Sequence, residues 1–185
     1  MTIRSQARST LAKLTLGLTL VLTSVLALAC ANADVGPSQI SLIGRSTSAP
    51  LLVSLERTSC YGWCPVYRVA VYADGVLEFE GRHFVLRPGL HEARVSAAQL
   101  TALRQAAARA RFAELEERYV RRDYPDMPSI ITVAQVDGAY KEVRHYFGDT
   151  SAPGELIRLE EEIDRIVGIE RWIGTPAERE AIASW

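Results

Sequence analysis

The sequence predicts an α+β domain, with an antiparallel sheet of about four to six strands and two helices packed on one face. Three observations predict it. Apolar residues alternate with other residues in several short segments, as in strands that bury one face. The dipeptide Asp-Gly, which favours tight hairpin turns, joins two pairs of these segments. Two longer segments carry apolar residues at helical spacing. The expected order is hairpin, helix, hairpin, helix (ββα-ββα).

The strand segments are bounded by turn signals. Asp74-Gly75 and Asp137-Gly138 mark the two hairpins, and Pro88-Gly89 marks a short edge hairpin between 83–86 and 92–95. The strands themselves are expected at 51–57, 66–72, 76–80, 129–136 and 139–146.

Two helices follow the hairpins. Ser96 and Gln99 match a capping box, so the first helix is predicted over about 97–110. The second follows Pro153 and ends at the C-cap Gly168. Its apolar stripe is Leu156, Leu159, Ile163 and Ile166, with the acidic residues at 160, 161, 162 and 164 mostly outside it. Trp172 and Ile173 are expected to pack back on the sheet, and 175–185 is a tail, helical in part.

Residues 1–33 resemble a secretory signal. Arg4, Arg8 and Lys13 precede an apolar run, 14–28, of about 15 residues. A membrane-spanning helix needs about 20 apolar residues, so an uncleaved anchor is the less favoured alternative. The chain is therefore expected to work outside the cytoplasm.

Two cleavage patterns overlap at the end of this run. Ala27-Leu28-Ala29-Cys30 resembles a lipobox, which would make Cys30 a lipidated first residue and attach the protein to a membrane. The segment 31–33, Ala-Asn-Ala, instead fits ordinary signal peptidase and would release a soluble protein. An outer-membrane or periplasmic lipoprotein is the preferred expectation, and a soluble secreted or periplasmic protein is the alternative.

The sequence after residue 33 predicts a linker and one domain. Residues 34–49 are rich in Ser, Gly, Ala and Pro and predict a flexible linker, and 50–174 are long enough for a single core. Without Arg4, Arg8 and Lys13, the 21 basic residues become 18 against 22 acidic ones, a net charge of −4. This charge argues against a nucleic-acid partner, which requires a basic surface.

Cys60 and Cys64 form the most specific motif of the mature chain. Three intervening residues, including Gly62, let the two Cα atoms come within disulfide range. A disulfide is preferred over thiol-disulfide exchange, because redox pairs use Cys-x-x-Cys at the start of a helix. A zinc site would need two more ligands, so neither a metal nor a cofactor is expected.

The residues around this motif resemble a known family. The pattern Arg-Thr-x-Cys-x-Gly-x-Cys-Pro-x-Tyr over 57–67, followed by Asp74-Gly75, is similar to the start of the uncharacterised bacterial domain-of-unknown-function family 6438. His145-Tyr146 and the helix at 156–166 resemble the end of that family, so the likeness covers about 50–174. The resemblance implies a secreted or lipid-anchored protein and supplies no catalytic residues.

Two further groups of residues are candidate sites. Asp123, Asp126 and His145 could converge on a cation or serve acid-base chemistry, although the aspartates are more simply turn formers beside Pro125 and Pro128. An aromatic set could form a contact surface, with sheet core and rim as the simpler interpretation. Its members are Tyr61, Trp63, Tyr67, Tyr124 and Tyr146.

These features favour a non-enzymatic envelope module. The leading hypothesis is that it binds an envelope protein or a cell-wall component through the disulfide-braced loop, with no catalytic residue assigned. The alternative is an extracytoplasmic enzyme, either a thiol-disulfide catalyst at Cys60 and Cys64 or a hydrolase without a recognised motif.

Overall fold

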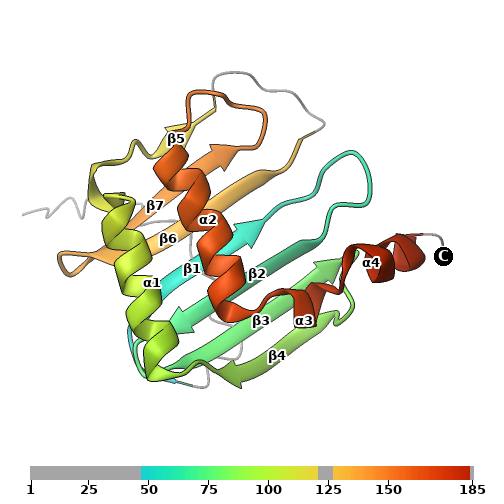
Figure 1. The fold of residues 1–185 in the computed structure, drawn as a ribbon, viewed down its shortest axis with the longest axis horizontal. Coiled ribbons are helices and arrows are strands. Elements are labelled where there is room, and N and C mark those ends of the chain that lie inside the picture. Colours follow the sequence, from blue (N-terminus) through green and yellow to red (C-terminus); the bar gives the residue numbers. More distant parts are fainter. Residues whose placement is uncertain (1–46, 121–126, 184–185) are drawn as a thin grey trace, which may run out of the picture. The chain divides into compact units, whose positions relative to one another are not determined.

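The computed structural model describes residues 47–120 and 127–183. The expectations for the signal segment, Cys30, most of the linker, Asp123, Tyr124 and Asp126 lie outside these residues. Figure 1 shows the elements that follow. The strands are β1 (Leu51–Arg57), β2 (Val66–Tyr72), β3 (Val76–His83), β4 (Gly89–Arg94), β5 (Arg118–Tyr119), β6 (Ser129–Val136) and β7 (Ala139–Tyr146). The helices are α1 (Ala97–Arg109), the 3-10 turn η1 (Phe112–Glu114), α2 (Gly154–Val167), α3 (Glu170–Ile173) and α4 (Pro176–Ala183).

The strands form one seven-stranded sheet in the order β4-β3-β2-β1-β6-β7-β5. All neighbouring pairs are antiparallel except β5 and β7, which are parallel. The α+β class is therefore confirmed, but the expected sheet of four to six antiparallel strands is smaller than the mixed sheet observed. The added strand, β5, has two residues, too short to show the two-residue periodicity that reveals a strand.

The central strand of the described sheet is β1, which pairs with both β2 and β6. Leu55 lies opposite Val69 on one side and Thr132 on the other. The first half of the domain is thus a four-stranded meander, β1 to β4, followed by α1. The expected ββα-ββα arrangement matches the second half and only roughly the first.

The edge hairpin differs from its prediction. β3 continues to His83, and β4 pairs with Val76–Gly81 rather than with 83–86. The chain leaves the sheet after His83 because Phe84 adopts a left-handed backbone conformation, with φ of 53°. Residues 84–88 therefore form a connecting loop.

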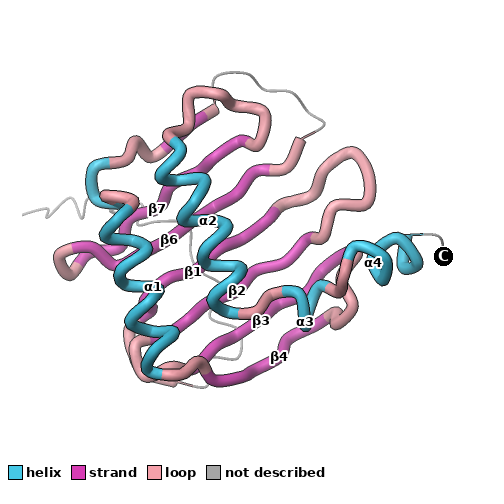
Figure 2. The backbone as a smooth tube through the Cα atoms, in the orientation of Figure 1, coloured by secondary structure: helices cyan, strands magenta, loops and turns pink. Residues whose placement is uncertain are grey.

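Helices α1 and α2 lie across the same face of the sheet (Figures 1 and 2). Both expected helix signals are confirmed. Ser96 and Gln99 form a capping box at the start of α1, and Gly168 ends α2 in the left-handed conformation, with φ of 65°. No helix of the described residues is long and apolar enough to span a membrane.

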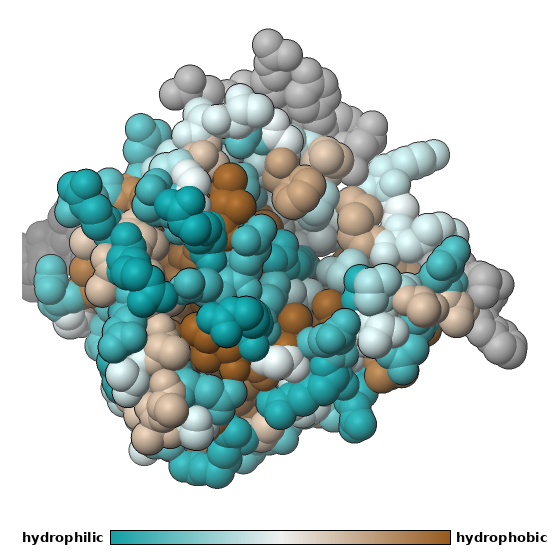
Figure 3. All heavy atoms as spheres, viewed as in Figure 1, coloured by the Kyte–Doolittle hydropathy of each residue, from teal (hydrophilic) through white to brown (hydrophobic). Residues whose placement is uncertain are grey.

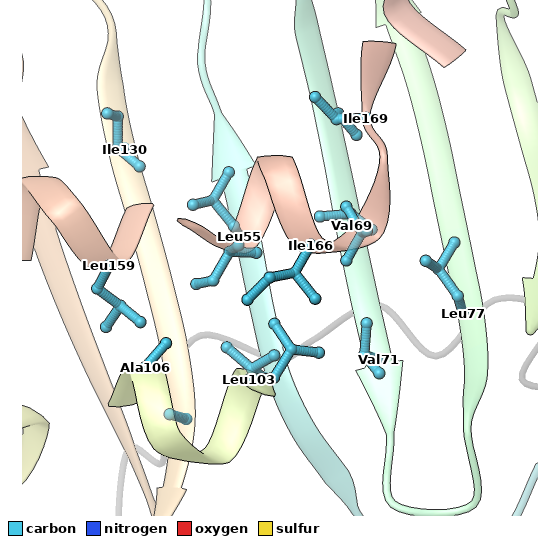
Figure 4. Packing of buried hydrophobic residues seen from close by; sticks show 14 of the residues in the cluster. Leu55, Val69, Val71, Leu77, Leu103, Ala106, Ile130, Leu159, Ile166 and Ile169 are labelled. Carbon is cyan, nitrogen blue, oxygen red and sulfur yellow. The ribbon is translucent and has the colours of Figure 1, made fainter. Parts of the chain in front are cut away.

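The main core lies between these helices and the sheet (Figure 4). Leu103 from α1 and Ile166 from α2 point toward Leu55, Val69 and Val71 of the central strands. Each buried side chain of this size contributes roughly 1.5 to 3 kcal/mol. Figure 3 shows a largely hydrophilic outer surface over the helices, with hydrophobic residues visible mainly in hollows.

The C-terminal segment packs as expected. Trp172 is buried, and its ring stacks on that of Phe79 in β3 at 5.2 Å between centroids. The backbone of the β3–β4 loop also binds this segment, because Arg87 N–H donates to the Trp172 carbonyl at 2.9 Å. α4 then forms the helical part of the tail.

Candidate functional site

The Cys60–Cys64 loop connects the central strand β1 to β2. The structure bridges the two cysteines with a Cα–Cα distance of 5.8 Å, inside the normal disulfide range. Gly62, between them, has φ of 152°, a conformation that other residues resist. The loop is therefore a closed, compact turn.

The stem of this loop is attached to the neighbouring strand. Thr58 N–H donates to the Ser129 carbonyl at 3.0 Å, and Ser129 N–H donates to the Thr58 hydroxyl at 2.7 Å. This reciprocal pair extends the β1–β6 pairing by one residue into the loop. The disulfide closes the loop, and the hydrogen bonds of Thr58 and Ser129 fix its stem. The segment between them therefore has little conformational freedom.

Two aromatic side chains project from this rigid loop. Tyr61 is 88% exposed and Trp63 is 64% exposed. Large aromatic side chains normally bury most of their surface, so this much exposure on a braced loop needs a reason.

Phe84, from the β3–β4 loop, supports Trp63 from the side. The two rings meet edge to face, with centroids 5.0 Å apart and an interplanar angle of 90°. Phe84 has φ of 53°. This backbone conformation costs a bulky residue roughly 1 to 3 kcal/mol, and such strained conformations recur at functional sites. We call Tyr61, Trp63 and Phe84 the aromatic tip.

The other described aromatic residues of the candidate contact surface do not lie there. Tyr67 is 0% exposed and Tyr146 is 6% exposed, so these two follow the simpler core interpretation and not the contact-surface one. Tyr67 shares the helix-covered face of β2 with Val69 and Val71, which places its ring in the core. Tyr124 lies outside the described residues.

Arg57, Tyr67 and Asp164 form a polar cluster beneath the loop stem. Arg57 donates to Asp164 Oδ2 from Nε at 3.0 Å and from Nη2 at 2.7 Å. The Tyr67 hydroxyl donates to Asp164 Oδ1 at 2.8 Å and accepts from Arg57 Nε at 2.9 Å. The cluster therefore ties α2 to β1 and β2 at the point where the loop begins.

Burial sets the ionisation of this cluster. Burial, followed by the negative charge of Asp164, raises the pKa of the Tyr67 phenol far above its usual value, although Arg57 opposes the shift. Tyr67 thus stays a neutral donor while Asp164 accepts three hydrogen bonds from the two partners. The cluster holds one positive and one negative charge, a matched pair suited to positioning.

His145 has a partner that the sequence did not indicate. Its Nδ1 lies 3.0 Å from Glu160 Oε2 and 3.2 Å from Oε1, and both side chains are buried. Glu160 was expected mostly outside the apolar stripe of α2, which is wrong. Its position four residues after Leu156 and three before Ile163 was the available signal, because that spacing lies on the buried face.

The candidate cluster of His145 with Asp123 and Asp126 includes two residues outside the described ones. Within the described part of the chain, no group of three or more His, Cys, Asp or Glu side chains is arranged to hold a metal ion. Among the same residues, His145 Nε2 and Thr132 Oγ1 are buried without a hydrogen-bond partner. Both are inaccessible, so they contribute to the core rather than to a surface site.

The His145–Glu160 pair predicts a pH dependence of stability. Burial raises the pKa of Glu160 above 4.5, although His145 and Arg57 oppose part of the shift. The folded protein therefore binds the proton of the Glu160 carboxyl more tightly than the unfolded chain does. The stabilisation from this proton is full below about pH 4.5 and is lost as the pH rises through the pKa of Glu160 in the folded protein.

We expect the free energy of unfolding to fall over that window relative to that of Glu160→Gln, which cannot titrate. Urea unfolding of both proteins between pH 4 and pH 8 checks this. If the two proteins differ in free energy of unfolding by the same amount at every pH from 4 to 8, the role assigned to Glu160 is refuted.

The fold and the site together define a small α+β domain that presents a disulfide-braced aromatic loop at one end of its sheet. The chain belongs to the family described as Domain of unknown function (DUF6438), whose model matches residues 51–167. The resemblance in the cysteine motif is thereby confirmed. No curated protein and no solved structure matches the chain.

Proposed function

We propose that this protein is an exported cell-envelope module that binds a cell-wall glycan through the aromatic tip. The observation that carries the proposal is the 88% exposure of Tyr61 and the 64% exposure of Trp63 on a loop closed by a disulfide. Rigid aromatic side chains lose little conformational entropy on binding, so they suit a contact site.

The size of the aromatic tip favours a narrow ligand. A standard protein interface buries about 800 Å² on each partner. Two aromatic side chains bury roughly 150 to 250 Å² each, so together they bury about half of that area. A sugar chain presents C–H faces, which pack on aromatic rings, and hydroxyls, which can hydrogen-bond to the Tyr61 phenol. A protein partner is the other outcome of the test below.

Export is the second part of the proposal. The apolar run at 14–28 and the following Cys30 support a lipid-anchored envelope location, and a bridged Cys60–Cys64 pair suits an oxidising compartment. Mass spectrometry of the mature N-terminus tests it. An acylated Cys30 is expected; a free N-terminus at Asp34 would remove the anchor and keep the export.

Thiol-disulfide catalysis is less well supported. The cysteine loop runs from strand to strand, whereas a helix start at the cysteine is what lowers a thiol pKa in such enzymes. Free-thiol titration separates the two functions. A bridge that stays closed in mild reductant is expected, and ready reduction with turnover of a disulfide substrate would favour the enzyme.

Removing the disulfide should lower stability modestly. In the chain-entropy model, a loop this short contributes about 2 kcal/mol. We expect Cys60→Ser with Cys64→Ser to lower the free energy of unfolding by that amount in urea, and to weaken glycan binding because the tip loses its brace. Unchanged stability would contradict the structural role of the bridge.

Co-sedimentation with purified cell-wall sacculi tests the binding function. The wild-type protein should pellet with sacculi, and the Tyr61→Ser, Trp63→Ser double variant should lose most of that binding. Tyr140→Ser is the matched control, because Tyr140 is 40% exposed at the start of β7, at the other end of the sheet. Equal pelleting of all three proteins, or none by the wild type, would refute the glycan proposal; cross-linking of the tip to an envelope protein would then favour a protein partner.

A further inference from the structure

A pocket lies at the opposite end of β1 and β6 from the aromatic tip. It has a volume of about 370 Å³, within the range of small-molecule sites. The start of β1, the C-terminal half of α1, η1 and the β6–β7 turn form its walls. We propose that this pocket binds an apolar amino acid or short apolar peptide in its zwitterionic form.

The inner wall of the pocket is apolar. Leu52, Ala107 and Val136 line it and are half-buried, and the buried Val53 and Phe112 also line it. These side chains belong to the main core or pack against it, so their positions are fixed by packing on several elements. An aliphatic side chain of a ligand would therefore contact a preformed apolar surface.

Two side chains of opposite charge lie on different walls of the pocket. Arg104 extends from α1, and Asp137 lies in the β6–β7 turn. Over 47–120 and 127–183, neither side chain makes a hydrogen bond or an ion pair. The pocket's other charged residues, Arg111 and Glu114, pair with each other. The groups available to a ligand are thus one guanidinium and one carboxylate.

The wall that carries Asp137 is conformationally fixed. Asp137 and Gly138 have φ of 49° and 83°, the positive pair that a tight two-residue hairpin turn requires. Asn is also favoured at the first of these positions, so Asp137→Asn removes the charge and preserves the turn.

This arrangement selects the ligand by charge. A free carboxylate would bind Arg104, an ammonium group would bind Asp137, and an apolar side chain would cover the inner wall. A ligand with one sign of charge would gain from one of these residues and be repelled by the other. The complementary ligand carries both charges and an apolar group.

Nuclear magnetic resonance titration of the protein with four probes tests this assignment. The probes are L-leucine, leucyl-leucine, N-acetyl-L-leucine, which lacks the ammonium, and L-leucinamide, which lacks the carboxylate. Leucine or leucyl-leucine should bind tightest and shift amides around the pocket; whichever is tighter distinguishes a single amino acid from a peptide.

Two variants assign the charges. Arg104→Gln should weaken leucine and N-acetyl-leucine by roughly threefold to tenfold, and should tighten leucinamide slightly because a repulsive charge is removed. Asp137→Asn should weaken leucine and leucinamide, and should tighten N-acetyl-leucine slightly for the same reason. Equal effects on all probes would overturn the zwitterion assignment.

A third variant tests the location. Ala107→Trp fills the pocket and should abolish binding, whereas Gln105→Trp, on the same helix and outside the pocket lining, should not. Binding that survives Ala107→Trp, or no binding of any probe by the wild-type protein, would overturn the proposal. None of these residues belongs to the aromatic tip, so failure here leaves the glycan proposal standing.

Discussion

Replacing Asp164 by Ala should destabilise the protein by about 3 kcal/mol. The substitution leaves Arg57 as a mostly buried charge and Tyr67 as a buried hydroxyl, each without its carboxylate acceptor. Removing one partner of a buried ion pair costs about 3 to 5 kcal/mol, and the 23% and 14% side-chain exposures of Arg57 and Asp164 place this pair at the lower end. Urea unfolding measures the change.

Glu162→Ala provides the matched control on the same helix. Glu162 also pairs with an arginine, Arg109, but the two side chains are 31% and 60% exposed. An exposed pair contributes about 1 kcal/mol or less. Similar losses for the two substitutions would show that the buried cluster does not hold α2 on the sheet.

Gly81→Ala should have an effect of similar size. A Cβ at this position would lie 2.4 Å from the Arg87 carbonyl oxygen and 2.7 Å from Val85 Cγ2, both in the loop that carries Phe84. Because backbone must move to relieve the first contact, we expect a loss of about 3 kcal/mol. The shift should also displace Phe84 from Trp63 and weaken sacculus binding.

Gly154→Ala separates this clash from the general effect of a methyl group. The nearest atoms there belong to the flexible side chain of Arg158, at 3.4 Å or more. Replacing glycine by alanine at this first residue of α2 should leave stability nearly unchanged. An equally small effect at Gly81 would mean that the β3–β4 loop yields easily and does not brace Trp63.

Much of the fold could be predicted from local patterns. The alternation in β2 and β6, the Asp-Gly turns, the capping box at Ser96 and the C-cap Gly168 each depend on neighbouring residues alone. Strand order depends on pairing between distant segments, and the sequence carries no local signal for it. The central position of β1 and the parallel strand β5 were therefore missed.

The site could also be predicted only in part, because local patterns reveal the cysteine loop but not the residues that pack on it from elsewhere in the chain. The Cys60–Cys64 spacing predicted the braced loop, and aromatic residues within it were natural contact residues. Phe84 could not be anticipated, because a bulky residue with positive φ has no sequence signature. For Tyr67, alternation with Val69 and Val71 indicates a buried face, and this pattern favoured the core interpretation over the contact surface.

The aromatic tip is the contact site that we propose for the glycan. Titration of the isotope-labelled protein with soluble cell-wall glycan fragments, followed by amide chemical shifts, tests it most directly. We predict that the largest shifts fall in 60–65 and 83–86, with little change at Tyr140. Shifts that spare both of these segments and cluster elsewhere on the domain would contradict the claim.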